Sequence, residues 1–247
     1  MPKIDLKNLT VTYPAKKGME YICLDSLDAS FTSNEVNVIL GESGSGKSTL
    51  LKAIAGILPY EGDILFDGIS SSKMSPKQKN LALVDQEITL YPNRSIFDNL
   101  ALPLKIARLG ADEIRSKVYK IAKELGISAT LSRLPRQISI GQQQRACLGK
   151  ALIKDPSVLL LDEPFSNLDE VRRSKERKLL KSIVKEKGLT VLISTHLQED
   201  VLALGDEIYL LEEGKISLSL KKEELAYSSH PLIRAMMASH IAENVHG

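Results

Sequence analysis

The strongest constraint on the fold is a glycine-rich segment that joins an apolar run to a helical stretch. Over nine residues it matches the pattern G-x-x-x-x-G-K-[ST]: Gly41, Glu42, Ser43, Gly44, Ser45, Gly46, Lys47, Ser48 and Thr49. Residues 36–40 predict a buried strand before it, and residues 50–55 predict a helix after it. Glycines in such a loop let successive amides face one phosphate cluster, and the helix N-terminus adds a positive dipole end. The segment therefore predicts a nucleotide-phosphate site in which Lys47 reaches the β- and γ-phosphates and Ser48 binds Mg²⁺.

Composition narrows the class of protein. The chain has 247 residues, enough for one large α/β domain or for a core with an inserted subdomain. Its 33 basic and 31 acidic residues give a net charge of +2, so neither nucleic acid nor an anionic membrane is expected as a partner. The most basic stretch, residues 172–178, has helical spacing and predicts a solvated helix face. Cys23 and Cys147 lie far apart in the sequence, which is typical of a reduced cytosolic protein without a disulfide.

Nothing in the sequence predicts direct insertion into a membrane. It contains no apolar run of about 18 residues, the length that suggests a spanning helix. Residues 1–5 are not typical of a signal peptide. A role at a membrane would therefore require a partner protein.

Two adjacent carboxylates end a second apolar run. Residues 158–161 predict a central strand that delivers Asp162 and Glu163 at its C-terminal end. In a phosphate-loop fold the first acid of such a pair holds Mg²⁺ through water. The second acid stands where it can polarise an attacking water, which predicts a catalytic role for Glu163.

The apolar pattern predicts the remaining elements. Strands or strand pairs are predicted over residues 4–13, 21–31, 62–68, 81–84, 190–195 and 206–220. Helices are predicted over residues 95–131 and 139–154 and, weakly, from residue 228 onward. Residues 70–79 are polar and predict a loop, whereas Pro92 and Pro103 are expected to mark the start of the helical insert.

Four single residues have both a structural and a functional interpretation. Tyr13 closes the first strand, where it can pack in the core or stack on a base. Gln86 follows a strand and could ligate Mg²⁺ or position a water, although a lone glutamine there is usually ordinary. Ser139 can cap its helix, whose free amides also form an anion site. His196 ends a strand, where it could reach a γ-phosphate, and the residues alone leave all four alternatives open.

Taken in order, the motifs resemble those of ABC-type ATPases, the nucleotide-binding subunits of ABC transporters. The resemblance covers roughly residues 3–225. It identifies residues 41–49 as Walker A, Gln86 as the Q-loop, 139–145 as the signature, 158–163 as Walker B, 166–169 as the D-loop and His196 as the H-loop. Tyr13 falls where the family has its adenine-stacking aromatic. The implied fold is an α/β phosphate-loop NTPase core with an N-terminal antiparallel β-layer and an inserted α-helical subdomain.

The resemblance also implies how the chain is divided. Residues 1–247 form a single ABC ATPase domain. Within it, residues 1–88 and 150–225 form the nucleotide-binding core, 89–149 the helical subdomain and 226–247 a C-terminal tail.

The implied ligands are ATP and Mg²⁺, held between two domains that pair head to tail. ATP contacts Tyr13, Gln86 and all nine residues of the glycine-rich segment, and Mg²⁺ is held by Ser48, Gln86 and Asp162. The residues that face the ATP of the opposite domain are Ser139, Gly141 and Gln142. The implied catalytic residues are Lys47, Glu163 and His196, and Asp169 communicates across the interface.

Two residues depart from the family pattern. Ile140 stands where the signature usually has a glycine, and a β-branched residue resists positive φ and would crowd a phosphate. Asp85 stands where import subunits usually have an aromatic residue, which puts an acid beside the groove expected to contact a membrane partner.

The resemblance implies the ATP-hydrolysing subunit of a transporter. Residues 76–104 are similar to those of bacterial solute-import ATPases. The expected partners are a second ATPase subunit, identical or paired, and an integral membrane permease that holds the chain at the cytoplasmic face of the membrane. An alternative is a soluble ABC ATPase that acts on nucleic acid or ribosomes, which the near-neutral charge and single cassette disfavour. A regulatory subunit that hydrolyses poorly is a third possibility, motivated by Ile140 and opposed by Glu163 and His196.

Overall fold

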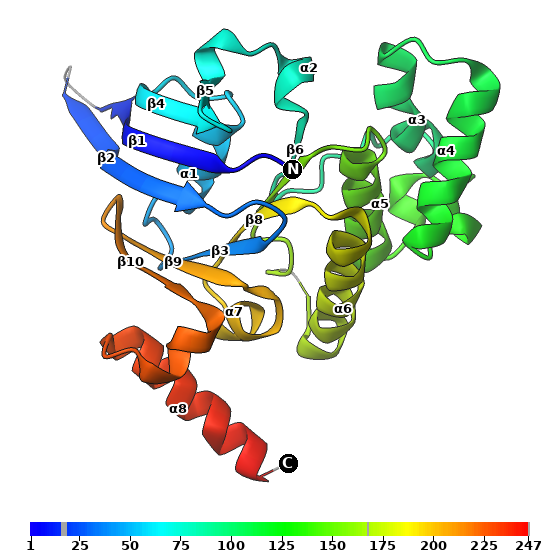
Figure 1. Ribbon diagram of the computed structural model, residues 1–247. Coiled ribbons are helices and arrows are strands. Elements are labelled where there is room, and N and C mark those ends of the chain that lie inside the picture. The colour runs from blue at the N-terminus through cyan, green and yellow to red at the C-terminus, as the bar shows by residue number, and fades with distance from the viewer. Residues whose placement is uncertain (16–18, 167, 247) are drawn as a thin grey trace.

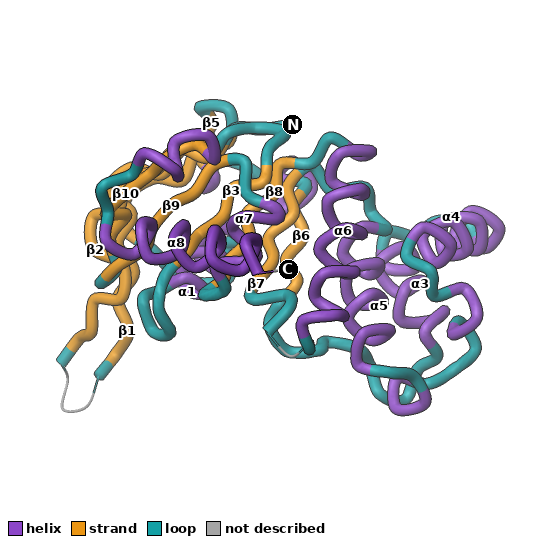
Figure 2. The backbone as a smooth tube through the Cα atoms, turned by 90° about the horizontal axis from the view of Figure 1, so that it is seen from below, coloured by secondary structure: helices purple, strands orange, loops and turns teal. Residues whose placement is uncertain are grey.

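The computed structural model describes residues 1–15, 19–166 and 168–246, with residues 239–246 as backbone only. Two β-sheets enclose helix α1 (Lys47–Ile54), and the longer helices gather on the other face of the second sheet (Figures 1 and 2). The D-loop residue Asn167 and residues 16–18 lie outside the described residues.

The first sheet is the antiparallel layer predicted from the N-terminal alternation. Its strands are β1 (Ile4–Pro14), β2 (Glu20–Phe31), β4 (Glu61–Phe66) and β5 (Ile69–Ser70), in the order β2-β1-β4-β5. All neighbouring strands run antiparallel, and Tyr13 on β1 pairs with Tyr21 on β2. The apolar side chains of one face pack on α1, which places the end of β1 beside the glycine-rich segment.

The second sheet carries the strands that lead into the motifs. Its six strands are β3 (Val36–Leu40), β6 (Leu81–Val84), β7 (Val158–Asp162), β8 (Thr190–Thr195), β9 (Glu207–Glu212) and β10 (Lys215–Lys221). The order is β10-β9-β3-β8-β7-β6, and only β10 runs antiparallel to its neighbour. The carboxyl ends of β3, β8 and β7 therefore meet at one edge, where open parallel sheets bind ligands.

Burial on both faces explains the continuous apolar runs of these strands. Along β7, Leu160 packs toward α1 and the first sheet, whereas Leu159 and Leu161 pack toward the helices of the opposite face. Buried parallel strands consequently lose the alternation of polar and apolar residues that one-sided sheets show.

Helices cover the second sheet and continue beyond it. They are α3 (Ile96–Ile106), α4 (Ala111–Glu124), α5 (Ile140–Leu152), α6 (Glu170–Lys187) and α7 (Gln198–Leu204). Figures 1 and 2 show α3, α4 and α5 grouped on one side of the sheets. Their apolar faces belong to the same buried cluster as β3 and β7. The division at residues 88/89 and 149/150 stays a proposal. Its second boundary falls inside α5, which continues to Leu152.

Two local expectations were wrong. Residues 70–79 contain the short helix α2 (Pro76–Lys79), because Ser75 and Gln78 form a reciprocal capping box. Pro103 lies inside α3 rather than at its start. The proline removes one internal hydrogen bond, but burial of Leu100 and Leu104 on the same helix offsets that loss.

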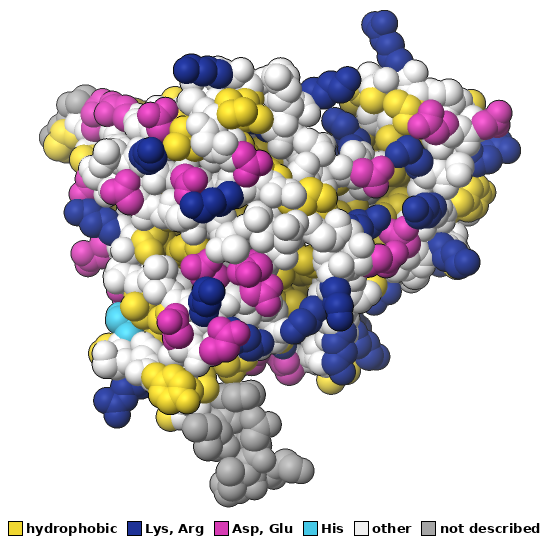
Figure 3. Space-filling model, in the orientation of Figure 1, with side chains coloured by type: hydrophobic (Ala, Val, Ile, Leu, Met, Phe, Trp, Pro, Cys, Tyr) yellow, Lys and Arg dark blue, Asp and Glu magenta, His cyan; other side chains and the backbone are white. Residues whose placement is uncertain are grey.

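The basic stretch at residues 172–178 lies on α6 and is solvated only in part. Arg172, Lys175 and Lys178 are exposed, and Lys and Arg side chains gather over this helix in Figure 3. Arg177 departs from the expectation, because only 6% of it is exposed. It points inward, where the carboxylates of Asp200 on α7 and of Glu170 at the start of α6 accept its hydrogen bonds.

Helix α8 (Pro231–His246) forms the tail and confirms its weak helical signal. Ile233 and Met236 near its start are fully buried in the cluster that also holds Leu220 and Leu225. Among the described helices, none combines the length and apolar character that crossing a bilayer demands.

Candidate functional site

The glycine-rich segment forms a loop whose glycines are required by its backbone. Gly44 and Gly46 have φ values of 85° and 107°, and Gly46 caps the start of α1. A side chain at Gly41 would collide with the carbonyl of Leu211 on the neighbouring strand β9. Bare backbone at these positions leaves the amides of the loop and of the first turn of α1 free to surround an anion.

Lys47 holds a buried positive charge at the mouth of this loop. Its side chain is 4% exposed, and Nζ donates hydrogen bonds of 2.8 Å to the carbonyls of both Gly41 and Glu42. Burial lowers the pKa of Lys47, while the nearby carboxylates of Glu163 and Asp162 act in the opposite direction. An incompletely neutralised buried ammonium attracts anions to the loop.

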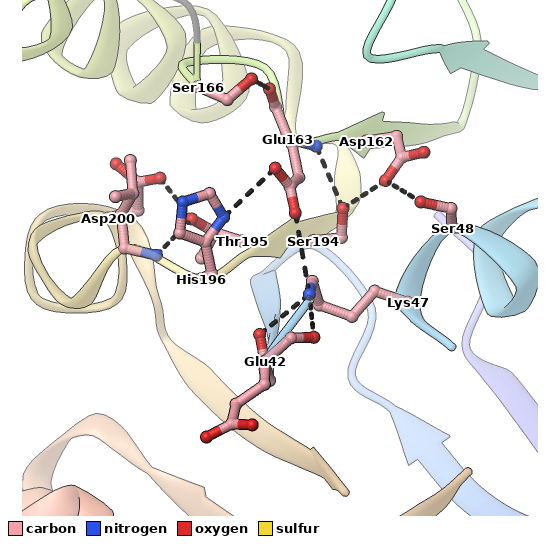
Figure 4. Close-up of polar contacts among 12 residues, drawn as sticks. Glu42, Lys47, Ser48, Asp162, Glu163, Ser166, Ser194, Thr195, His196 and Asp200 are labelled. Atoms are coloured by element: carbon pink, nitrogen blue, oxygen red, sulfur yellow. Dashed lines mark hydrogen bonds and ion pairs between the residues drawn. The ribbon is translucent and has the colours of Figure 1, made fainter. Parts of the chain in front are cut away.

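Asp162 links the loop to the centre of the sheet. The Oγ atoms of Ser48 and Ser194 donate hydrogen bonds of 2.9 and 2.6 Å to the same Oδ1 atom of Asp162 (Figure 4). Asp162 is 2% exposed at the end of β7. Sequence reasoning missed Ser194, although its hydroxyl interrupts the apolar run of β8 and could have marked it. A carboxylate and hydroxyls at this spacing are oxygen donors that suit a hard divalent cation.

Glu163 is aimed into the site by an unusual backbone conformation. Its φ is 43°, a left-handed value that non-glycine residues rarely adopt. The Glu163 amide donates to the carbonyl and the Oγ of Ser194, at 3.1 and 3.0 Å. The carboxylate then lies between two cationic or protonatable groups, with Oε1 at 3.7 Å from Lys47 Nζ and Oε2 at 3.2 Å from His196 Nδ1 (Figure 4).

Tyr13 lies beside the first turn of α1. Its hydroxyl is 3.2 Å from Oγ1 of Thr49, to which the thiol of Cys23 also donates at 3.3 Å. The tyrosine is half-buried. It therefore sits next to the glycine-rich loop rather than in the interior of the core. Glu42, Ser43 and Gly44 are exposed and line a cleft with β2 and the β9–β10 hairpin.

Gln86 is exposed and lines a pocket that also includes Ser48 and Asp162. The preceding residue, Asp85, forms an ion pair of 3.3 Å with Lys52 on α1. The acid that departs from the family pattern is thus engaged with the helix that follows the glycine-rich loop.

Ser139, Gly141 and Gln142 lie at the start of α5. Ser139 Oγ accepts a hydrogen bond of 3.3 Å from the Gln142 amide, and Gln142 Oε1 accepts one of 3.1 Å from the Ser139 amide. Among the described residues, their hydrogen bonds stay within this helix start and do not reach Lys47. The structure therefore brings together the loop, Asp162, Glu163 and His196, and leaves this group apart.

Ile140 does not meet the backbone conflict expected at its position. It is the first residue of α5 and is absent from the residues with positive φ, because a residue within a helix has a negative φ. Its side chain is 49% exposed. The departure thus adds an apolar side chain to the surface and leaves the helix entry unstrained.

Comparison with known proteins identifies the family. A family model described as ABC transporter matches residues 24–166, more than half of the chain. The chain belongs to the ABC transporter family. It is 39% identical over 231 residues to a glucose import ATP-binding protein of Saccharolobus solfataricus, covering 91% of this chain and 65% of that protein. It is 36% identical over 217 residues to an sn-glycerol-3-phosphate import ATP-binding protein of Chromobacterium violaceum, covering 87% and 58%.

The chain spans less than two thirds of the length of these ABC relatives. A solved ATP-binding cassette, a dimer in a post-hydrolysis state with ADP and Pi, superposes with a TM-score of 0.79 at 28% identity. This similarity covers 88% of this chain and 98% of that one. The predicted ABC ATPase fold is confirmed.

Proposed function

We propose that this chain is an ATP-hydrolysing subunit that pairs with a second such subunit and powers a membrane permease for solute import. The observation that carries the proposal is the position of the Glu163 carboxylate, 3.7 Å from Lys47 Nζ and 3.2 Å from His196 Nδ1. A carboxylate placed beside a phosphate-binding loop can activate water against the terminal phosphate. The names of the related proteins, which are import ATP-binding proteins, support the direction of transport.

The residues around the loop fit a triphosphate with a divalent cation. The Ser45 hydroxyl is buried without a hydrogen-bond partner among the described residues, so it has capacity for a ligand oxygen. Ser48 and Asp162 would hold Mg²⁺, with Gln86 in the same pocket. Bound there, Mg²⁺ would neutralise charge on the β- and γ-phosphates.

Each remaining side chain has a role that follows from its position. Lys47 would exchange its two carbonyl partners for phosphate oxygens. Glu163 would accept a proton from the attacking water, and His196 would orient that carboxylate and contact the γ-phosphate. Tyr13, beside the loop, would stack on the base.

Ser139, Gly141 and Gln142 would serve the ATP of the second subunit. They lie at an exposed helix N-terminus, which favours anions, but do not join the chain's own loop. A head-to-tail pair brings this terminus to the opposite nucleotide. The dimeric state of the related solved cassette supports pairing.

The permease would dock beside Gln86. A cavity of about 50 Å³ beside it is lined by Asp85 and Gln86, by Arg145 on α5 and by Glu176 on α6. A helix of the membrane partner that docks at this cavity would contact Gln86. Movement of Gln86 in the pocket of Ser48 and Asp162 would then be transmitted to the partner. The chain would then be held at the cytoplasmic face of the membrane by that partner.

Phosphate release from ATP by the purified chain with Mg²⁺ tests the enzymatic part. Glu163→Gln should abolish most of the release and accumulate an ATP-bound dimer in light scattering. Asp67→Asn is the matched control, because Asp67 also has a positive φ, of 48°, but lies in the β4–β5 turn. Absence of phosphate release from the wild-type chain, or equal activity of the two variants, would refute the assignment.

Affinity purification from native membranes in mild detergent tests the partner. Recovery of a polytopic membrane protein is the expected outcome. Recovery of ribosomes or nucleic acid instead would favour a soluble ABC ATPase and refute the transport role.

A further inference from the structure

A buried ion pair lies behind the strand end that carries His196. Arg177 on α6 donates from Nε to Oδ1 of Asp200 on α7 at 2.6 Å. Only 6% of Arg177 and 1% of Asp200 is exposed. Buried charges require partners, and removal of either Arg177 or Asp200 would leave the other as an unpaired buried charge. This pair therefore has a fixed geometry, unlike the solvated basic residues around it on α6.

Asp200 also fixes the backbone on both sides of His196. Thr195 donates from Oγ1 to Oδ2 of Asp200 at 2.6 Å, and the Leu197 amide donates to Thr195 Oγ1 at 3.0 Å. The Asp200 amide donates to the Leu197 carbonyl at 3.2 Å. Figure 4 shows Thr195, His196 and Asp200 together with Glu163 at this end of the sheet. The histidine thus stands between two residues whose positions depend on one buried carboxylate.

The other side of Arg177 contacts the first residue of its own helix. Its Nη1 lies 2.8 Å from Oε1 of Glu170, the first residue of α6. Arg173 joins the same segment, because its Nε donates to the Leu168 carbonyl at 2.9 Å and its Nη1 lies 3.4 Å from Glu170. The Arg177 guanidinium is therefore held by Asp200 on α7, behind the segment that carries His196, and by Glu170 at the start of its own helix.

We propose that Arg177, Asp200 and Thr195 are positioning residues that hold the His196 ring against the Glu163 carboxylate, a role that rests on the proposed ATPase function. None of the three side chains lines the cleft or pocket beside the glycine-rich loop. They act through His196, whose Nδ1 lies 3.2 Å from Glu163. We call this chain of contacts, from Arg177 through Asp200 and Thr195 to His196, the relay. Displacement of a catalytic group by about 1 Å can lower a rate roughly a hundredfold, so the relay would govern turnover more than ATP binding.

Thr195→Val tests the relay, because valine has the shape of threonine but cannot donate to Asp200. It leaves the Arg177–Asp200 pair intact, whereas Asp200→Asn would strand a buried guanidinium and endanger folding. Thr195→Val should lower kcat about tenfold while KM for ATP changes less than about twofold. Thr195→Ser retains the hydroxyl and should restore kcat to within about twofold of wild type. Equal kcat for wild type and the valine variant would overturn the proposal.

A double-mutant cycle separates positioning from general stability. In a His196→Ala background, Thr195→Val should cause no further loss of kcat, because the group it positions is gone. A full additional tenfold loss in that background would show that Thr195 does not act through His196. Glu124→Gln is the control for α6, since it removes the ion pair of Lys187 at the far end of the helix and should leave kcat unchanged.

A readout without ATP distinguishes failure of the relay from failure of the proposed function. The NMR signals of the His196 ring should shift in Thr195→Val and remain at wild-type positions in Thr195→Ser. Unmoved ring signals in the valine variant would refute the relay even if the chain hydrolyses ATP. Shifted signals in a chain without ATPase activity would support the relay and refute the function.

Discussion

The Nδ1 atom of His196 lies 3.2 Å from the Oε2 atom of Glu163. The two residues follow neighbouring strands, β8 and β7, and their contact spans the edge of the sheet where the glycine-rich loop begins. The Glu163 side chain is 14% exposed and the His196 side chain 45% exposed, so the carboxylate is the more buried of the two. The histidine is therefore placed to set the direction in which Glu163 meets a water.

Removal of this ring should impair turnover more than binding. His196→Ala is expected to lower kcat about a hundredfold, within the range for a group that aids proton transfer, and to leave ATP affinity within a few-fold. Phosphate release and equilibrium nucleotide titration measure the two effects. His230→Ala is the control, because the ring of His230 lies near Glu212 and not near Glu163. A loss of affinity that equals the loss of turnover would contradict the assignment.

Lys47 should contribute mainly to ligand binding. Lys47→Met removes the buried ammonium and leaves the carbonyls of Gly41 and Glu42 without their donor, so the ligand-free melting temperature should stay level or fall. ATP with Mg²⁺ should raise the melting temperature of the wild type and not of this variant. Lys105→Met, on α3, should keep the ATP effect and cost at most about 1 kcal/mol of stability through its surface ion pair with Asp98. A wild-type rise of the melting temperature of Lys47→Met with ATP and Mg²⁺ would refute the role of Lys47 in ligand binding.

The affinity for ATP should weaken at alkaline pH. Burial lowers the pKa of Lys47 from its ordinary value of 10.5 in the free chain, against the pull of Glu163 and Asp162. Phosphates raise it again on binding, so the lysine's contribution is complete below the free-state pKa and is lost as pH rises through the bound-state pKa. Between these two values binding should take up protons. Calorimetry in buffers of different ionisation heat measures this uptake, and its absence would be incompatible with a charged Lys47 on the phosphates.

Tyr13 should bind the base through its ring. Tyr13→Ala is expected to weaken ATP binding by about 1–3 kcal/mol, the usual value for a stacked base. Tyr13→Phe retains the ring and loses only the contact with Thr49, so ATP affinity should be preserved. Tyr227→Ala, a tyrosine that is 88% exposed, serves as the control in the same titration. Equal affinities for all three variants would exclude Tyr13 from the base site.

Ile140 should hinder pairing through its side chain. Ile140→Gly is expected to strengthen ATP-driven dimerisation, because it removes an exposed apolar group from the helix start proposed to face the opposite nucleotide. The glycine should also lower the stability of helix α5 by about 0.5–1 kcal/mol. Val171→Gly makes the same kind of change in the first turn of α6, where Val171 is 68% exposed, and should leave dimerisation unaltered. Light scattering with ATP decides between these outcomes, and unchanged pairing of Ile140→Gly would mean that the isoleucine is harmless.

The strands that lead into the site were predictable because each is a run of consecutive apolar residues. The apolar runs of β3, β7 and β8 reflect a sheet covered on both faces, and each is followed at once by its polar residues. The reciprocal cap of Ser139 and Gln142 was foreseen in part for the same reason, since capping is local. The small helix α2 was overlooked although Ser75 and Gln78 have the spacing of a capping box.

What could not be predicted depends on residues far apart in the chain. Ser194 meets Asp162 across 32 positions, and Arg177 meets Asp200 across 23. Neither pairing follows from composition or periodicity, because the order of strands in the sheet decides which ends become neighbours. Arg177 consequently looked like one of several solvated basic residues, and only the packing of α6 on α7 shows its burial.

The insertion of β8 between β3 and β7 has a consequence for how the protein is made. The loop and Lys47 precede Asp162 and Ser194 by more than a hundred residues, yet Ser48, Ser194 and Asp162 meet in one hydrogen-bonded group. Pairings of such long range form slowly, because a large loop must close before the contact can form. A nascent chain that already exposes the glycine-rich loop therefore has no completed binding site, and nucleotide can stabilise this protein only after β8 has been translated.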